Sequence, residues 1–302
     1  MSMEFVEFQW LNDSPSHKSA LQEVLNCSGQ LLKKHFSSKE LSRPIKIRDT
    51  SRLPLDLVNH LSINPVFKGP RPYVIKETKN YLVIHKPAGV HSHPLCYSDQ
   101  DTLINFLAEG GYWESLRVNQ LSYDRGLIFR LDFETSGIML VAKNQQYFEE
   151  MRLNFKDKMK RKLYWAIVEG HFDQEGFWTH YFKPTGLKGS KQKVELQTHP
   201  DALMGQLEVS SIMTLNDKTL VMVNLSSGLR HQIRAQLAAL GFPILGDELY
   251  GGQKAERLFL HAWRYEWDEI EEDRQADLFD SFFDLDRALE MSQDMLRTFK
   301  SR

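Results

Sequence analysis

The pattern of hydrophobic and polar positions changes near residue 70. Between residues 19 and 36, apolar side chains recur three and four positions apart on a broken face, which predicts a helix. The stretch that follows is less regular and is interrupted by Pro44, Pro54, Pro65, Pro70 and Pro72. Because prolines mark turns and linkers, we place a boundary near residues 69–72. This divides the chain into an N-terminal extension, residues 1–71, and a second domain, residues 72–302.

Beyond the boundary, short apolar stretches come in pairs around polar turns, as in β-hairpins. The pairs are 73–77 with 81–85, 127–131 with 138–142, and 207–215 with 219–225, and a further strand is predicted over 163–168. Helices are predicted from a cap at Asn144 to about residue 160, over 229–240, and near the C-terminus over 285–299. Hairpin strands with interspersed helices predict an α+β fold with a mixed, mostly antiparallel sheet and flanking helices.

Composition excludes several classes of protein. Hydrophobic residues make up 41% of the 302 residues, which is enough for a sizeable core and argues against disorder. The only cysteines are Cys27 and Cys96, so a disulfide framework and a multi-cysteine zinc site are excluded. The N-terminus lacks the pattern of a signal peptide, and no apolar run approaches the ~18 to 20 residues that span a bilayer. We therefore expect a soluble, cytoplasmic protein without a membrane partner.

The net charge of -2 conceals an uneven distribution of charge. Residues 265–290 carry eleven acids and two bases, and without them the chain has a net charge of +7. Basic residues concentrate over 155–163, which include Lys158, Lys160 and Lys162, and over 183–193. A basic face with an acidic C-terminal segment fits a polyanionic partner, and a merely solvated charged surface is the alternative.

Two polar segments could carry chemistry. Arg130 and Asp132 follow a predicted strand at a polar turn, although an Asp often serves only the turn itself. The second segment begins the helix predicted over 229–240. It carries Arg230, His231, Gln232 and Arg234, which would crown a cleft or form a solvated helix face.

Three further residues have ordinary explanations when taken alone. Tyr164 would be read as a core aromatic in a strand. His91 and His93 lie near Cys96 in a weak metal-ligand pattern, but no partner cluster supports a metal, and histidines are common in loops.

Together, these segments resemble the RluA-type pseudouridine synthases, with the family's motifs in family order over about residues 72–265. Residues 81–89 resemble the KPAG segment, 130–137 the RLD-x-ETSG signature, 162–164 the K-x-Y strand, 228–234 with 242–251 the HQIR helix and the PILGD-x-LYG loop, and 260–262 the LHA segment. Two positions depart from the family pattern. Phe129 stands where the family usually has His, and Arg230 stands one position away from the usual basic residue.

The resemblance implies an enzyme that isomerises uridine in structured RNA to pseudouridine. The reaction breaks the N-glycosidic bond, turns the uracil and rejoins it through carbon 5. It adds no group, so we expect no cofactor and no metal. A carboxylate must attack the sugar or take a proton from it, and an ionised Asp132 can do either. A cationic partner keeps such a carboxylate charged, and the resemblance implies that Arg234 is that partner.

The resemblance also assigns the remaining residues. Tyr164 would help to remove the carbon-5 proton, and Arg130 would fill the space left when the target base leaves its stack. Substrate binding would involve Arg130, Arg230, His231, Gln232, Lys158, Lys160 and Lys162.

The expected partner is ribosomal or transfer RNA, and we expect a monomer. Residues 28–34 faintly resemble a helix of a small RNA-binding module, and a divergent extension is the alternative. An inactive RNA-binding protein on the same fold is the alternative for the whole chain.

Overall fold

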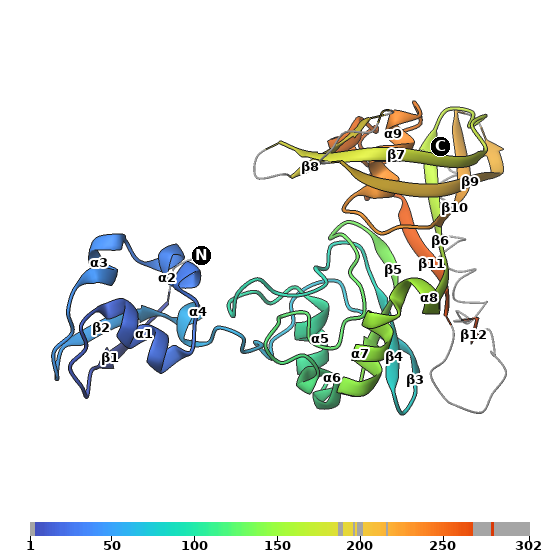
Figure 1. Cartoon of the computed structure of the whole chain (residues 1–302). Coiled ribbons are helices and arrows are strands. Elements are labelled where there is room, and N and C mark those ends of the chain that lie inside the picture. The colour runs from blue at the N-terminus through green and yellow to red at the C-terminus, as the bar shows by residue number, and fades with distance from the viewer. Residues whose placement is uncertain are drawn as a thin grey trace.

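The computed structural model describes residues 4–186, 190–195, 197, 202–215, 217–267 and 279–280. These residues form an α+β fold in which helices flank a large sheet, as predicted (Figure 1). No helix in this part of the chain is long and apolar enough to cross a membrane.

The N-terminal residues form a small unit around a core of their own. Its elements are β1 (Phe5–Gln9), α1 (His17–Leu25), α2 (Gly29–His35), α3 (Ser38–Ser42), β2 (Thr50–Pro54) and α4 (Leu55–Val58), with β1 and β2 antiparallel. Trp10, Leu21 and Leu32 are buried in its hydrophobic cluster, which is separate from the two clusters of the remaining chain. The helix predicted over 19–36 is broken into two, because Asn26 takes a left-handed conformation (φ 48°) and Ser28 caps α2.

The large sheet has the strand order β3-β4-β5-β11-β6-β10-β9-β7-β8. Its strands are β3 (Tyr73–Glu77), β4 (Tyr81–Lys86), β5 (Ser136–Ala142), β6 (Met159–Glu169), β7 (Gly176–Thr185), β8 (Lys191–Glu195), β9 (Leu203–Leu215), β10 (Lys218–Leu225) and β11 (Leu260–Trp267), and β12 (Phe279–Asp280) pairs with the end of β11. Among these pairs only β5 and β11 are parallel, which confirms a mixed, mostly antiparallel sheet.

Helices connect the strands and cover this sheet. They are α5 (Leu103–Glu109), α6 (Trp113–Arg117), α7 (Gln145–Leu153), α8 (Phe155–Lys158), α9 (Gln232–Ala239) and the 3-10 helix η2 (Glu248–Tyr250). The six residues of β4 are all buried, and alternate ones belong to different hydrophobic clusters. The two faces of β4 are therefore both covered, which explains the apolar run from Tyr81 to Ile84.

The hairpins β3–β4 and β9–β10 confirm the sequence prediction. The strand predicted over 127–131 is wrong: it makes an isolated bridge from Leu127 to Val141 and then turns away from the sheet. The helix predicted to reach residue 160 ends early, because the chain pairs with β11 from Met159 onward. The predicted helix over 285–299 and most of the acidic segment lie outside the described residues.

One close approach places the segment around Asp132 against the sheet. Gly137 of β5 pairs with Ala262 of β11, and a Cβ on Gly137 would lie 2.3 Å from the Ala262 carbonyl oxygen. Its φ of 130° also suits glycine. Glycine at this position therefore lets β5 begin directly beside β11, immediately after the polar turn.

Candidate active site

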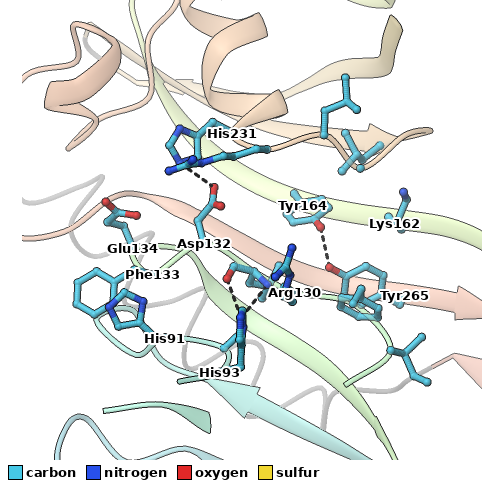
Figure 2. Close-up of a pocket in the computed structure, with 18 of the residues that line it drawn as sticks. His91, His93, Arg130, Asp132, Phe133, Glu134, Lys162, Tyr164, His231 and Tyr265 are labelled. Atoms are coloured by element: carbon cyan, nitrogen blue, oxygen red, sulfur yellow. Dashed lines mark hydrogen bonds and ion pairs between the residues drawn. The ribbon is translucent and has the colours of Figure 1, made fainter. Parts of the chain in front are cut away.

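A cleft of about 1140 Å³ lies at this end of the sheet. Its walls come from residues 91–95, 128–134, strands β6 and β11, and the turn before α9. Figure 2 shows Asp132 between His231 on one side and the Arg130 and His93 side chains on the other, with Tyr164 and Tyr265 across the cleft. The two polar segments singled out in the sequence therefore meet at one site.

Asp132 sits on a loop that is held on both sides. Before it, the Ser92 hydroxyl donates to the Leu131 carbonyl at 2.8 Å and accepts from the Leu131 amide at 3.1 Å. After it, the Lys86 ammonium donates to the Phe133 carbonyl at 3.4 Å and to the Val90 carbonyl at 2.8 Å. Lys86 is completely buried, and this burial lowers its pKa to about 7, although the Asp132 carboxylate opposes the shift. These bonds hold the backbone on both sides of Asp132, whose side chain lines the cleft.

Two basic side chains approach the Asp132 carboxylate without a close hydrogen bond. His231 Nε2 and Arg234 Nη1 each lie 3.9 Å from Asp132 Oδ2. Burial raises the pKa of Asp132, while His231 and then Arg234 oppose that shift. Burial also lowers the pKa of His231. The fixed positive charge beside Asp132 is therefore that of Arg234.

The strongest partner of Arg234 is Asp247, not Asp132. Arg234 Nε and Nη2 each donate to an Asp247 carboxylate oxygen at 2.8 Å, and both side chains are almost completely buried. Arg234 Nη1 also lies 3.3 Å from Glu134 Oε2. Asp247 follows Gly246, whose φ is 83° and whose Cβ would collide with the Arg257 carbonyl oxygen, so only glycine fits that loop. The direct Arg234–Asp132 pair expected from the sequence is thus a longer ion pair within a larger network.

Tyr164 lies on β6 with its hydroxyl 2.7 Å from the hydroxyl of Tyr265 on β11. Both rings are buried and both line the cleft. Burial raises the pKa of Tyr164 far above that of an ordinary phenol, and the Tyr265 hydrogen bond only partly opposes this. Tyr164 is therefore protonated at neutral pH.

His231 is held in a strained conformation at the start of α9. Its φ of 52° is left-handed, which is uncommon for a residue with a side chain. Its Nδ1 lies 3.2 Å from the Tyr250 hydroxyl, which also accepts a hydrogen bond from the Gln192 amide at 2.9 Å. Such strained conformations persist where neighbouring contacts hold them, and they cluster at functional sites.

Comparisons with known proteins identify the family of the chain. The family model described as RNA pseudouridylate synthase matches residues 80–239, which is more than half of the chain. The chain belongs to this family. Ribosomal large subunit pseudouridine synthase D of Borreliella burgdorferi is 33% identical over 202 residues, which are 65% of this chain and 60% of that protein. The chain thus matches about three fifths of the length of that relative.

Further relatives support the same family and fold. An uncharacterized RNA pseudouridine synthase of Helicobacter pylori (strain 26695) is 30% identical over 226 residues, covering 70% of this chain and 78% of that protein. The solved structure of human RNA pseudouridylate synthase domain containing 1 has a TM-score of 0.51 and 22% identity, covering 75% of this chain and 95% of that one. The latter similarity supports the pseudouridine synthase fold.

The other predicted site residues divide into two groups, those that line the cleft and those that do not. Arg130, Arg230 and Lys162 line the cleft, and the Arg130 side chain is 58% exposed. Lys162 donates to the Ser227 carbonyl at 2.5 Å, and burial lowers its pKa to about 8. Lys158 and Lys160 do not line the cleft.

Gln232 is the first residue of α9 and follows directly on the turn before it. It is buried, and its amide bonds only to the protein: it accepts from the Ser227 hydroxyl and the Leu229 amide, and it donates to the Gln206 carbonyl and the Gln236 side chain. Gln232 therefore holds the turn before α9 together, and its predicted part in substrate binding stays a prediction.

The histidines considered as metal ligands have other contacts. His93 Nδ1 lies 3.3 Å from Asp124 Oδ1, and the His91 ring packs against the Phe133 ring. In the part of the chain that the structure describes, no group of three or more His, Cys, Asp or Glu side chains could hold a metal ion.

Sequence reasoning did not assign roles to Asp247, Tyr265 or Lys86. Asp247 and Lys86 lie inside the motifs quoted for the family, and this position could have identified them as candidate site residues. Tyr265 follows the LHA motif by three positions, and only the pairing of β6 with β11 brings it to Tyr164.

Proposed function

We propose that the chain is an RNA pseudouridine synthase that converts specific uridines in structured RNA to pseudouridine. The observation that carries the proposal is the Asp132 carboxylate in a cleft, 3.9 Å from Arg234, in a chain of this family. The chemistry requires a carboxylate that can reach the sugar of a nucleotide taken out of its stack, and Asp132 is the carboxylate held on a fixed loop at that position.

The proposed reaction begins when Asp132 attacks carbon 1 of the ribose or removes a proton from the sugar. Either step needs the ionised carboxylate, which burial disfavours and Arg234 favours. The glycosidic bond to nitrogen 1 breaks, the uracil turns, and carbon 5 bonds to carbon 1 of the ribose. The carbon-5 proton then leaves and nitrogen 1 gains a proton, so the net reaction is an isomerisation.

Tyr164 is proposed to contact the uracil during the last proton transfer. Because its pKa is raised, it meets the base as a neutral phenol and acts through its hydroxyl, in a chain with Tyr265, and not as a free phenolate. Arg130, with its exposed side chain in the cleft, is proposed to occupy the space that the flipped base leaves.

Ribosomal RNA is the first substrate to test, because the relative from Borreliella burgdorferi is named as a synthase of the large ribosomal subunit. We propose transfer RNA as the second substrate and the cytoplasm as the site of action. Lys158 is partly buried and Lys160 is exposed, and both lie in the sequence between two residues that line the cleft, Phe155 and Lys162. We propose that both lysines bind phosphates outside the cleft. The N-terminal unit, with Lys33, Lys34 and His35 in the last turn of α2, is proposed to be a divergent RNA-binding module.

The first experiment is pseudouridine mapping of ribosomal and transfer RNA from a strain that lacks the gene. A uridine that loses its modification and regains it when the gene is returned would identify the substrate. In vitro, the purified protein should release tritium from that RNA when its uridines are labelled at carbon 5.

The matched variants are Asp132→Asn and Asp217→Asn. Asp217 is an exposed carboxylate in the turn between β9 and β10, and it does not line the cleft. Asp132→Asn should abolish tritium release and keep the wild-type circular dichroism spectrum, whereas Asp217→Asn should remain active. RNA binding without turnover by the wild type would favour the alternative, an inactive RNA-binding protein.

A further inference from the structure

Next to Asp132, the cleft displays an aromatic pair that the proposed reaction does not use. The ring centroids of Phe133 and His91 lie 4.3 Å apart, with the rings tilted by 34°. Both residues line the cleft, and Phe133 remains 37% exposed although its ring is large and apolar. Figure 2 shows the pair on the opposite side of Asp132 from Tyr164 and Tyr265.

The backbone beneath the two rings is fixed. The Phe133 carbonyl accepts from the Gly89 amide at 2.9 Å and from the buried Lys86. The His91 amide donates to the Asp101 carbonyl at 3.0 Å, and the His91 carbonyl accepts from the first amide of α5, that of Leu103, at 2.8 Å. Rings presented by a fixed backbone lose little conformational entropy when a ligand packs on them.

The charges around the pair restrict what can pack there. Phe133 lies between Asp132 and Glu134, and the Glu134 side chain is 47% exposed. Two carboxylates at this corner repel a phosphate. Exposed Arg130 and Arg230 stand elsewhere on the cleft wall and attract one. A ligand that spans the cleft therefore presents a flat neutral face to the aromatic pair and its phosphates to the arginines.

The cleft also has room for more than the target nucleotide. Its volume of about 1140 Å³ is above the range of ~300 to 1,000 Å³ that is usual for a pocket holding one small molecule. Single-stranded RNA is commonly bound by stacking its unpaired bases on aromatic side chains. The volume of the cleft, its charges and its exposed rings therefore all favour single-stranded RNA as the ligand.

We propose that the Phe133–His91 pair is a stacking site for an unpaired base of the substrate RNA that neighbours the target uridine. The inference rests on the proposed function, because it takes RNA as the substrate. The pair would select RNA in which the target uridine and a neighbour are both unstacked.

The test measures RNA binding by fluorescence anisotropy. The probe is a fluorescein-labelled RNA strand that carries the uridine found by mapping, or a single strand of mixed sequence if mapping finds none. Phe133→Leu removes the ring and keeps an apolar side chain, and Phe133→Tyr and His91→Phe keep the rings. The matched control is Phe177→Leu, since Phe177 is an exposed ring on β7 that does not line the cleft.

Loss of one stacked base weakens binding by about 5- to 150-fold, and we expect Phe133→Leu to fall in this range. Phe133→Tyr, His91→Phe and Phe177→Leu should bind as the wild type does. The salt dependence of binding by Phe133→Leu should be unchanged, because no phosphate contact is lost. With an abasic nucleotide at the stacked position, wild type and Phe133→Leu should bind equally, which identifies the base concerned.

Two results would overturn the stacking site: binding by Phe133→Leu as tight as by Phe177→Leu, or a Phe133→Leu defect that persists at every abasic position. Failure of the proposed function is distinguishable. A wild type that forms no pseudouridine but loses affinity on Phe133→Leu would keep the stacking site and refute the activity.

Discussion

The buried pair of Arg234 and Asp247 offers the sharpest test of how this fold holds its reactive site. Replacing Asp247 with Asn keeps the shape of the side chain but removes its charge and one of its two acceptor oxygens. Arg234, whose side chain is only 3% exposed, is then left with the Glu134 carboxylate at 3.3 Å and the Asp132 carboxylate at 3.9 Å.

The size of the effect follows from this geometry. Removing one partner of a buried ion pair costs about 3 to 5 kcal/mol, because the other charge stays buried. Glu134 and Asp132 compensate in part, so we expect the lower end, about 3 kcal/mol. In a protein of 302 residues, about 3 kcal/mol corresponds to a fall in Tm of roughly 5 °C. The freed guanidinium also acts more strongly on Asp132, so the pKa of Asp132 should fall and the acid limb of the activity profile should move to lower pH.

Urea denaturation followed by circular dichroism measures the stability, and tritium release across a pH series measures the second effect. The matched control is again Asp217→Asn, whose carboxylate is exposed and should leave both unchanged. The double variant Asp247→Asn with Arg234→Met removes both charges, so it should be much less destabilised than the sum of the two single variants. If Asp247→Asn is as stable as Asp217→Asn, or the double variant equals that sum, the reasoning about the pair is refuted.

Three other predictions follow from the pKa shifts and contacts. Because burial raises the pKa of Asp132, the folded protein holds the carboxyl proton more tightly than the unfolded chain does, and it loses stability as the pH rises through the folded pKa. Asp132→Asn should therefore be at least as stable as the wild type when both are unfolded with urea at neutral pH. A less stable variant would contradict this. Tyr265→Phe removes the hydroxyl that lies 2.7 Å from the buried Tyr164 hydroxyl, so it should lower the free energy of unfolding by about 1 to 3 kcal/mol. It should also lower kcat more than it changes KM, and an unchanged kcat would show that Tyr265 does not position Tyr164. The pKa of Lys86 is about 7 in the folded protein and ordinarily 10.5, so between these pH values the unfolded chain binds more protons than the folded protein. The stability of the wild type should therefore rise with pH across that window by up to about 5 kcal/mol relative to Lys86→Met. Parallel stability profiles of the two proteins against pH would contradict the lowered pKa of Lys86.

Local features of the sequence determined a large part of this protein. The hairpin from residue 73 to 85 follows from two apolar stretches around a polar turn, and it appears as predicted. The cap at Asn144 also appears as predicted, since its side chain accepts from the Tyr147 amide. These features depend on neighbours a few residues apart, and such neighbours are visible in the sequence. The motifs likewise indicated the family, because each motif is a short run of neighbouring residues.

The boundaries of elements were decided by tertiary contacts. Residues 127–131 form an apolar stretch typical of a strand, but only Leu127 and Ile128 pair with β5, and the segment 128–131 lines the cleft. The sequence before Met159 is typical of a helix, and the helix was predicted to continue to about residue 160. Met159 instead begins β6, because it pairs with Trp267 of β11. Propensity is weak beside the hydrogen bonds and burial that a neighbouring strand supplies.

The network around the carboxylate was also beyond the sequence. Arg234 and Asp247 are separated by 13 residues and meet because Gly246 closes a loop, and Tyr164 and Tyr265 are separated by 101 residues and meet because β6 pairs with β11. A motif names the charged residues, but the distance between two side chains depends on the register of strands and the angle of loops. The sequence therefore indicated which residues form the site, and only the tertiary structure decided that Asp247, and not Asp132, holds Arg234 most closely.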